Sequence, residues 1–358
     1  MNKKILSILQ YLFFLCLGIF LIWLSLRKLK PNDWEEMKYA FLTARYSLII
    51  PVVIALLASH YSRAIRWKIL MEPLGYNPRI SNTYLAVLIG YMANLAFPRL
   101  GEVLKCTVLA RYEKVPADKL VGTIVAERAF DVICLVIVML VTFFTQTDLI
   151  GEFLSSKLNE LVGSKGGGKL YYYLGGALLF FIILFIVLKR FAHISFIQKF
   201  KAIIKGIWHG LTSVRYIKKK GWFIFHTLFI WAMYLISVRI GMFALTETSA
   251  YGMKPSLSVL STGSIAMILT PSGIGAYPVF VQGTMELYGL REIMGKAFGW
   301  LMWSVQFFQQ LLSGFVALAL FPYFNKKKNK NEEFVAHTNE VAVTSGSNQE
   351  DRSMENPG

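Results

Sequence analysis

Three charged residues, Glu127, Arg128 and Asp131, lie inside an apolar run from 121 to 145. Residues three and four apart share one side of a helix, so both Glu127 and Arg128 lie on the same side as Asp131. Ionised groups within a membrane helix are costly unless they pair or face water. Two interpretations are open: a structural ion pair of Arg128 with Asp131 or Glu102, or a polar cavity that binds a charged headgroup.

Further arginines could contact phosphate. Arg63 and Arg66 are three apart at the end of a second apolar run, and Arg99 precedes Glu102 by three positions. Guanidinium groups bind phosphate oxygens bidentately, which favours a phosphate clamp. Long basic side chains at a helix end also extend to the membrane surface, so interfacial anchoring is the alternative.

Two apolar stretches are interrupted by proline and glycine. The stretch 83–97 is followed by Pro98-Arg99-Leu100-Gly101, and the stretch 257–269 by Pro271-Ser272-Gly273-Ile274-Gly275. Irregular backbone at membrane depth persists only where it is buried in protein or lines a wet cavity. The breaks are either interfacial turns or broken helices that face each other across a central cavity. The candidate substrate-binding residues are Arg63, Arg66, Asn94, Arg99, Glu102, Glu127, Arg128, Asp131, Pro271, Gly273 and Gly275.

The elements that carry these residues are predicted to be membrane helices. About 20 apolar residues cross the roughly 30 Å hydrocarbon core as a helix. The sequence predicts an all-α polytopic membrane protein with about six full spans and two broken-helix, re-entrant hairpins. The expected spans are 5–26, 46–61, 121–145, 170–188, 221–245 and 297–321. The two halves have the same order of elements and opposite orientation, which predicts an inverted-topology repeat.

Basic residues orient the chain. The segment 189–220 is rich in Lys and Arg and has no Asp or Glu, and Lys326, Lys327 and Lys328 follow the last span. Short basic loops stay in the cytoplasm, so this segment and both termini are expected there. Residues 1–322 form the predicted transmembrane domain. The polar tail 323–358 is expected to be disordered because it has too few apolar residues to bury.

Composition narrows the function classes. The chain is 55% hydrophobic and 16% charged, with a formal net charge of +17. Because the basic residues flank membrane spans, we expect attraction to anionic lipid and no binding of nucleic acid. Cys16, Cys106 and Cys134 have no CxxC spacing and the five histidines form no HxxxH pair, so we expect no metal, no cofactor and no enzymatic activity.

Four motifs together resemble a known family. They are Arg63-Ala64-Ile65-Arg66-Trp67, Gly90-Tyr91-Met92-Ala93-Asn94 through Glu102, Glu127-Arg128-Ala129-Phe130-Asp131, and Pro271 to Tyr277. Residues 5–322 are similar to the flippase-like integral membrane domain of bacterial lysylphosphatidylglycerol synthases, which also occurs alone. The resemblance implies a multi-pass protein of the bacterial cell (inner) membrane that moves a lipid between leaflets.

Two departures bear on the substrate. No soluble aminoacyltransferase domain follows residue 322, and Pro278 stands where the family pattern leads us to expect an acidic residue. We therefore expect translocation of a phosphate-bearing lipid, either an anionic phospholipid or a polyprenyl-phosphate carrier. The alternatives are an ion-coupled small-solute transporter and a non-transporting membrane scaffold. A homo-oligomer is compatible with each of these.

Overall fold

The protein is a bundle of helices. The computed structural model describes residues 16–23, 25–27, 29–97, 99–147, 149, 151 and 217–354, with side chains as far as Lys326. Within these residues there is no strand, and the all-α class is confirmed. The helices are α2 (Pro31–Leu42), α3 (Ile49–Met71), α4 (Ile80–Ala96), α5 (Leu100–Glu113), α6 (Ala117–Thr145), α10 (Lys220–Met242), α11 (Thr246–Ser249), α12 (Met253–Leu269), α13 (Ala276–Leu287) and α14 (Glu292–Met354), with 3-10 turns η1 (Tyr46–Leu48), η2 (Glu72–Leu74) and η4 (Pro271–Gly273).

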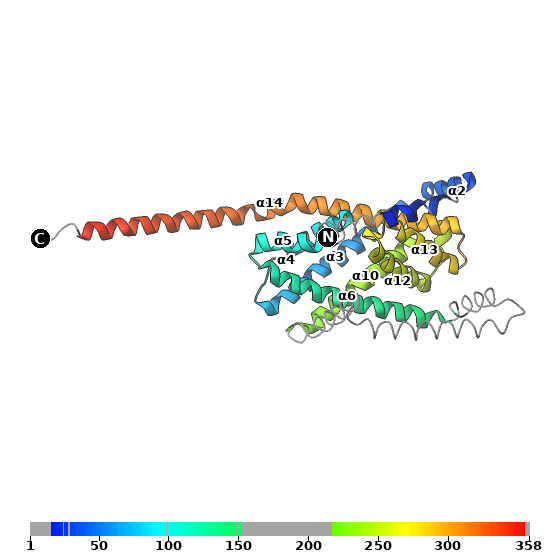
Figure 1. Cartoon of the computed structure of the whole chain (residues 1–358), viewed down its shortest axis with the longest axis horizontal. Helices are drawn as coiled ribbons and strands as arrows, with labels where there is room; N and C mark the ends of the chain where they lie inside the picture. Colours follow the sequence, from blue (N-terminus) through cyan, green and yellow to red (C-terminus); the bar gives the residue numbers. More distant parts are fainter. Residues whose placement is uncertain are drawn as a thin grey trace, which may run out of the picture.

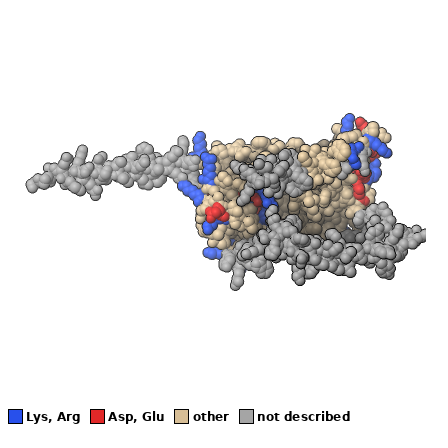
Figure 2. Space-filling view, in the orientation of Figure 1, with Lys and Arg blue, Asp and Glu red and all other residues tan. Residues whose placement is uncertain are grey.

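The bundle has the length and surface of a membrane protein. Three helical stretches in the described residues are long and apolar enough to cross a bilayer: Tyr46–Leu74, Lys220–Met242 and Glu292–Lys326. Charged side chains gather at the two ends of the bundle, with a broad band of other residues between them (Figure 2). The predicted spans 5–26 and 170–188 lie largely or wholly outside the described residues, so the number of six spans stays a prediction.

The two broken hairpins correspond to each other. Helices α4 and α12 are both 17 residues long, and α3 and α10 are both 23 residues long. Each 17-residue helix is followed, three positions later, by a non-glycine residue in the left-handed region, Arg99 (φ 67°) or Ser272 (φ 50°). In the sequence a proline precedes each of these residues. The two halves therefore break their helices in the same way.

The packing of the helices follows the same pattern. In the first half α4 packs on α5 and on α14, and in the second half α12 packs on α13 and on α6. Each broken hairpin thus contacts the long final helix of the other half, and α3 packs along α10 at the centre (Figure 1). The final helix of each half also packs on the hairpin of its own half, α14 on α13 and α6 on α5, so each final helix contacts both hairpins.

Helices α3 and α10 run antiparallel. The backbone N–H of Arg45, before α3, donates to the carbonyl of Ala244, after α10, at 2.8 Å. At the other end Lys219, before α10, pairs with Glu72, after α3, at 2.7 Å. Equivalent helices of opposite direction support the repeat predicted from the order of the elements.

One predicted boundary was wrong, and one helix was not predicted. The second span does not end near Tyr61, because α3 continues to Met71 and buries Arg63 and Arg66 within the bundle. The sequence analysis also missed α2. Its signals were Pro31 at the first helical position and Asp33, whose carboxylate accepts the N–H of Lys30 at 2.8 Å.

The tail after residue 322 is helical, whereas the sequence predicts disorder. Disorder is predicted from residue 323, whereas α14 continues as a helix to Met354. This extension projects away from the bundle (Figure 1). The prediction rested on the small apolar surface that the tail can bury, and the projecting helix is consistent with that argument. The domain boundary near residue 322 stays a prediction.

Candidate functional site

Arg63 and Arg66 lie inside the protein. The side chain of Arg66 is 0% exposed and that of Arg63 is 7% exposed. Both point from the same side of α3 because they are three residues apart. The interpretation of these arginines as interfacial anchors was therefore wrong.

Two carboxylates from α6 meet these arginines. Arg63 Nη1 lies 2.8 Å from Glu127 Oε1 and 2.5 Å from Asp131 Oδ2. Arg66 Nη2 lies 2.6 Å from Asp131 Oδ1 and 3.6 Å from Glu127 Oε1. The four-residue spacing of the carboxylates places both on the face of α6 that packs on α3, as the sequence predicts.

Lys105 of α5 adds a third cation. Its Nζ lies 2.8 Å from Glu127 Oε2 and 4.5 Å from the centre of the Trp67 ring. The buried part of this ion cluster, defined as Arg63, Arg66, Lys105, Glu127 and Asp131, has three cations and two carboxylates. Within the described residues, Arg63 Nε and the Nε and Nη1 atoms of Arg66 are buried without a hydrogen-bond partner. The ion cluster therefore has an excess positive charge and unused donors.

The ion cluster lies inside the helical bundle, and α6 is long enough to cross a membrane. Asp131 is at the middle of the 29-residue helix α6, about 21 Å from either end at 1.5 Å per residue. An uncompensated charge at that depth costs several kcal/mol. Buried charges at such a position are either fully paired or serve a ligand, and pairing here is incomplete.

Arg128 and Glu102 form a more open rim beside the ion cluster. Arg128 Nε lies 2.8 Å from Glu102 Oε1, at ion-pair distance although the N–H is poorly aligned for a hydrogen bond. Their side chains are 43% and 29% exposed. Arg128 Nη1 is also 3.8 Å from Asp131 Oδ2. Of the two partners expected for Arg128, Glu102 is the closer, and Asp131 pairs chiefly with Arg63 and Arg66.

Aromatic side chains also lie against the ion cluster. The ring of Tyr91, from α4, stacks on His60 with 4.1 Å between ring centroids, and the Arg63 guanidinium lies 5.9 Å from the Tyr91 ring centre. Arg63 Nη2 also donates to the hydroxyl of Tyr234, from α10, at 3.4 Å. Residues from both halves therefore enclose the ion cluster.

Close helix packing positions Lys105 and Glu102. The N–H of Gly101 donates to Asn94 Oδ1 at 2.9 Å, which caps the start of α5. A Cβ on Gly101 would lie only 1.9 Å from the carbonyl oxygen of Gly90. The two glycines thus allow α4 and α5 to cross closely enough to bring Lys105 to the ion cluster.

The two breaks touch each other. Ser272 Oγ donates to the carbonyl of Asn94 at 3.1 Å, and Trp303 Nε1 donates to the carbonyl of Ser272 at 3.0 Å. The sequence predicts a central cavity between the breaks, whereas the second break contacts the end of α4 directly; Pro98 itself lies outside the described residues. Asn94 therefore joins the first hairpin to the second.

The other candidate residues lie apart from the ion cluster. Arg99 is exposed, and no ion pair joins it to another residue in the described part of the chain. Pro271 and Gly273 are buried in η4. A Cβ on Gly275 would lie 2.2 Å from the carbonyl of Gly18, so this glycine packs against the helical residues 16–23. These three second-half residues shape the break and do not face the carboxylates.

Sequence reasoning missed part of the site. Lys105 follows Glu102 by three positions, a signal that would have placed it on the same side of α5. Tyr91 and His60 gave no chemical signal by themselves. Tyr234 is far from Arg63 in the chain, and only the packing of α10 on α3 brings them together.

Comparisons with known proteins identify the family. A family model described as the lysylphosphatidylglycerol synthase TM region matches residues 7–314. The chain belongs to this family. The resemblance inferred from the four motifs is confirmed, and the protein is a membrane protein of the lysylphosphatidylglycerol synthase TM family.

One relative has a similar length. A UPF0104 membrane protein of the archaeon Methanocaldococcus jannaschii is 24% identical, and the match covers 92% of this chain and 98% of that protein. No solved structure matches the chain significantly. Four residues of the ion cluster come from two of the motifs that carry the resemblance: Arg63, Arg66, Glu127 and Asp131.

Proposed function

We propose that this protein translocates a phosphate-bearing lipid between the leaflets of a cell membrane, with the ion cluster as the phosphate site. The observation that carries the proposal is the excess positive charge of the ion cluster inside the helical bundle. A bound anion would compensate this charge and occupy the unused donors of Arg63 and Arg66.

The rim gives a route to the ion cluster. Arg128 and Glu102 are partly exposed, whereas Arg66 and Glu127 are fully buried. A phosphate can first contact Arg128 in exchange for Glu102, and then approach the buried arginines. Because Tyr234 of the second half contacts Arg63 of the ion cluster, a movement of one half against the other would open or close the site.

Headgroup translocation in reconstituted vesicles tests the proposal. The substrate would be phosphatidylglycerol with a fluorescent group on its glycerol, and the readout the fraction that a membrane-impermeant reductant can reach. Arg66→Gln shortens the side chain and removes its charge, so we expect slower transfer. The matched control is Arg291→Gln, because Arg291 pairs with Glu36 at the exposed end of the bundle. Equal transfer by wild type and Arg66→Gln would refute the phosphate site.

A structural role is the second candidate. Glu127 has three basic neighbours from two other helices, so the ion cluster also holds α3, α5 and α6 together. Under a purely structural role, Arg66→Gln and Arg128→Gln would lower thermal stability in detergent, and their transfer rates would fall only as far as the amount of folded protein falls. A loss of transfer at unchanged stability supports translocation instead.

A further inference from the structure

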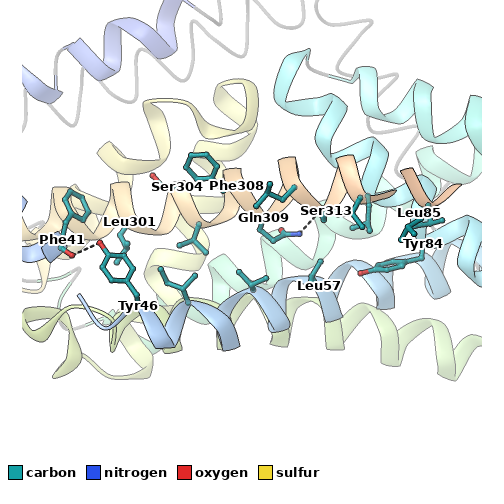
Figure 3. A pocket seen from close by; sticks show the side chains of 17 residues that line it. Phe41, Tyr46, Leu57, Tyr84, Leu85, Leu301, Ser304, Phe308, Gln309 and Ser313 are labelled. Carbon is teal, nitrogen blue, oxygen red and sulfur yellow. Dashed lines mark hydrogen bonds between the residues drawn. The ribbon is translucent and has the colours of Figure 1, made fainter. Parts of the chain in front are cut away.

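An apolar groove crosses the bundle on a face away from the ion cluster. It has a volume of about 750 Å³ and is lined by α3, α4 and α14 together with Phe41 and Tyr46 (Figure 3). None of its lining residues is charged. Two of its walls, α3 and α14, belong to the stretches long and apolar enough to span a bilayer. The groove therefore opens within the hydrocarbon region.

The groove is long and narrow. Its lining on α14 extends from Leu301 to Leu320, about 28 Å at 1.5 Å per residue, which is close to the roughly 30 Å hydrocarbon thickness. Its volume of about 750 Å³ is spread over that length, so the groove is narrow. One extended hydrocarbon chain fits a narrow apolar groove of this kind.

Tyrosines stand at both ends of the groove. Tyr46, near Phe41, lies at one end and Tyr84 at the other (Figure 3). Tyrosine is enriched where a membrane meets water, so these residues place the ends of the groove near the two interfaces. The groove is thus oriented along the bilayer normal.

The polar side chains of the groove bond to each other and to the interior. Gln309 Nε2 donates to Ser313 Oγ at 3.1 Å, and Gln309 Oε1 lies 3.3 Å from His60 Nε2. His60 stacks on Tyr91, whose ring faces the Arg63 guanidinium. The surface left to an occupant is apolar, and a continuous chain of contacts joins it to the ion cluster.

We infer that this groove binds one hydrocarbon chain of a membrane lipid along the bilayer normal. An empty groove would forfeit the dispersion contacts of its lining, and lipid chains are the molecules at hand in a bilayer. The inference goes beyond the proposed function, because it concerns the tail of a lipid and a different face of the molecule. A phospholipid tail reaches across about half of the roughly 30 Å hydrocarbon core, so the groove is long enough to receive it from either leaflet.

Photocrosslinking tests the groove. The protein would be reconstituted in phosphatidylglycerol vesicles that contain a small fraction of phosphatidylglycerol with a diazirine in the middle of one acyl chain. After illumination, mass spectrometry would locate the labelled residues. We expect labels on groove residues such as Val53 and Leu312 in severalfold excess over Val136 and Leu140, which are exposed on α6 outside the groove.

Two matched variants on α14 complete the test. Val316→Trp fills the groove, whereas Leu318→Trp adds the same bulk at an exposed position that does not line it. Labelling of the groove should fall severalfold in Val316→Trp and stay unchanged in Leu318→Trp. Even labelling of all apolar faces, or no effect of Val316→Trp, would overturn the inference.

A third variant separates this inference from the proposed function. Arg66→Gln removes a charge from the ion cluster without touching the groove, so it should keep the groove labelling even if lipid transfer fails. Loss of groove labelling in Arg66→Gln would show that the tail does not bind there by its own contacts, which contradicts the inference.

Discussion

At the scale of residues, the ion cluster shows how a membrane protein keeps charges away from lipid. Glu127 is fully buried, yet Arg63 and Lys105 each approach it within 2.8 Å. Burying two ions is costly, and their attraction compensates only when geometry and further hydrogen bonds are good. The carboxylates meet that condition, whereas Arg66 keeps unused donors. Because the unused groups are N–H donors on a cation, the site favours an anionic ligand over a cationic one.

Glu127→Gln should destabilise the fold. It keeps the shape of the side chain but leaves Arg63 and Lys105 with fewer partners in a buried place, a loss of about 3–5 kcal/mol. Thermal unfolding in detergent would show a clear fall in the midpoint temperature. Glu36→Gln is the control, because Glu36 and Arg291 form an exposed pair of the kind that contributes little. Equal midpoints for Glu127→Gln and wild type would contradict the paired geometry.

Arg99→Gly should raise stability. Arg99 has φ 67°, a region that a residue with a Cβ adopts at a cost, and glycine adopts it freely. Because the Arg99 side chain is exposed and forms no ion pair with a described residue, we expect a gain and no loss of packing. Thermal unfolding measures the change, with Arg99→Ala as the control that removes the side chain and keeps the Cβ. A lower midpoint for Arg99→Gly than for Arg99→Ala would show that this φ is not a source of strain.

At the scale of elements, the sequence predicted the broken hairpins and placed charges correctly on α6. Proline and glycine marked both breaks, and the four-residue spacing of Glu127 and Asp131 marked a shared face. The end of α3 could not be predicted in this way, because Arg63 and Arg66 look like interfacial residues until their partners on α6 are known. The Asn94–Ser272 contact joins the two halves of the chain, so local patterns could not reveal it.

Gly101→Ala tests the close crossing of α4 and α5. Its Cβ would lie 1.9 Å from the Gly90 carbonyl oxygen, so the helices must separate, at a cost of at least about 1–3 kcal/mol. Gly122→Ala is the matched control within a helix, because nothing lies within 4 Å of its Cβ position. There we expect a gain of up to about 1 kcal/mol from helix propensity. If both variants unfold at the wild-type temperature, α4 and α5 do not cross closely enough at Gly90 and Gly101 to exclude a Cβ.

At the scale of the whole molecule, the two halves have matching broken hairpins, and the equivalent helices α3 and α10 run antiparallel. The two halves therefore have opposite orientations. Such an architecture suits a protein whose central site opens to either side in turn. The ion cluster is not symmetric within it, since its charged residues all belong to the first half and the second half contributes Tyr234. One half carries the charges and the other completes the enclosure.

Opposite ends of the bundle should be accessible from opposite sides. Lys219, paired with Glu72, and Arg291, paired with Glu36, are exposed at the two ends. In a background without Cys16, Cys106 and Cys134, Lys219→Cys should resist a membrane-impermeant maleimide in intact cells, and Arg291→Cys should react. The basic loop that precedes α10 sets this expectation. Reaction of Lys219→Cys from outside would reverse the topology.

Binding of a lipid phosphate by the ion cluster can be measured without a transport assay. Native mass spectrometry of the protein, purified in mild detergent, measures it directly by the mass of the lipid that remains bound. We expect wild type and Arg291→Gln to retain one phosphate-bearing anionic lipid that Arg66→Gln loses, whereas a lipid held in the groove stays bound in all three proteins. Wild type without bound lipid, or Arg66→Gln with the same lipid at the same occupancy, would contradict phosphate binding by the ion cluster.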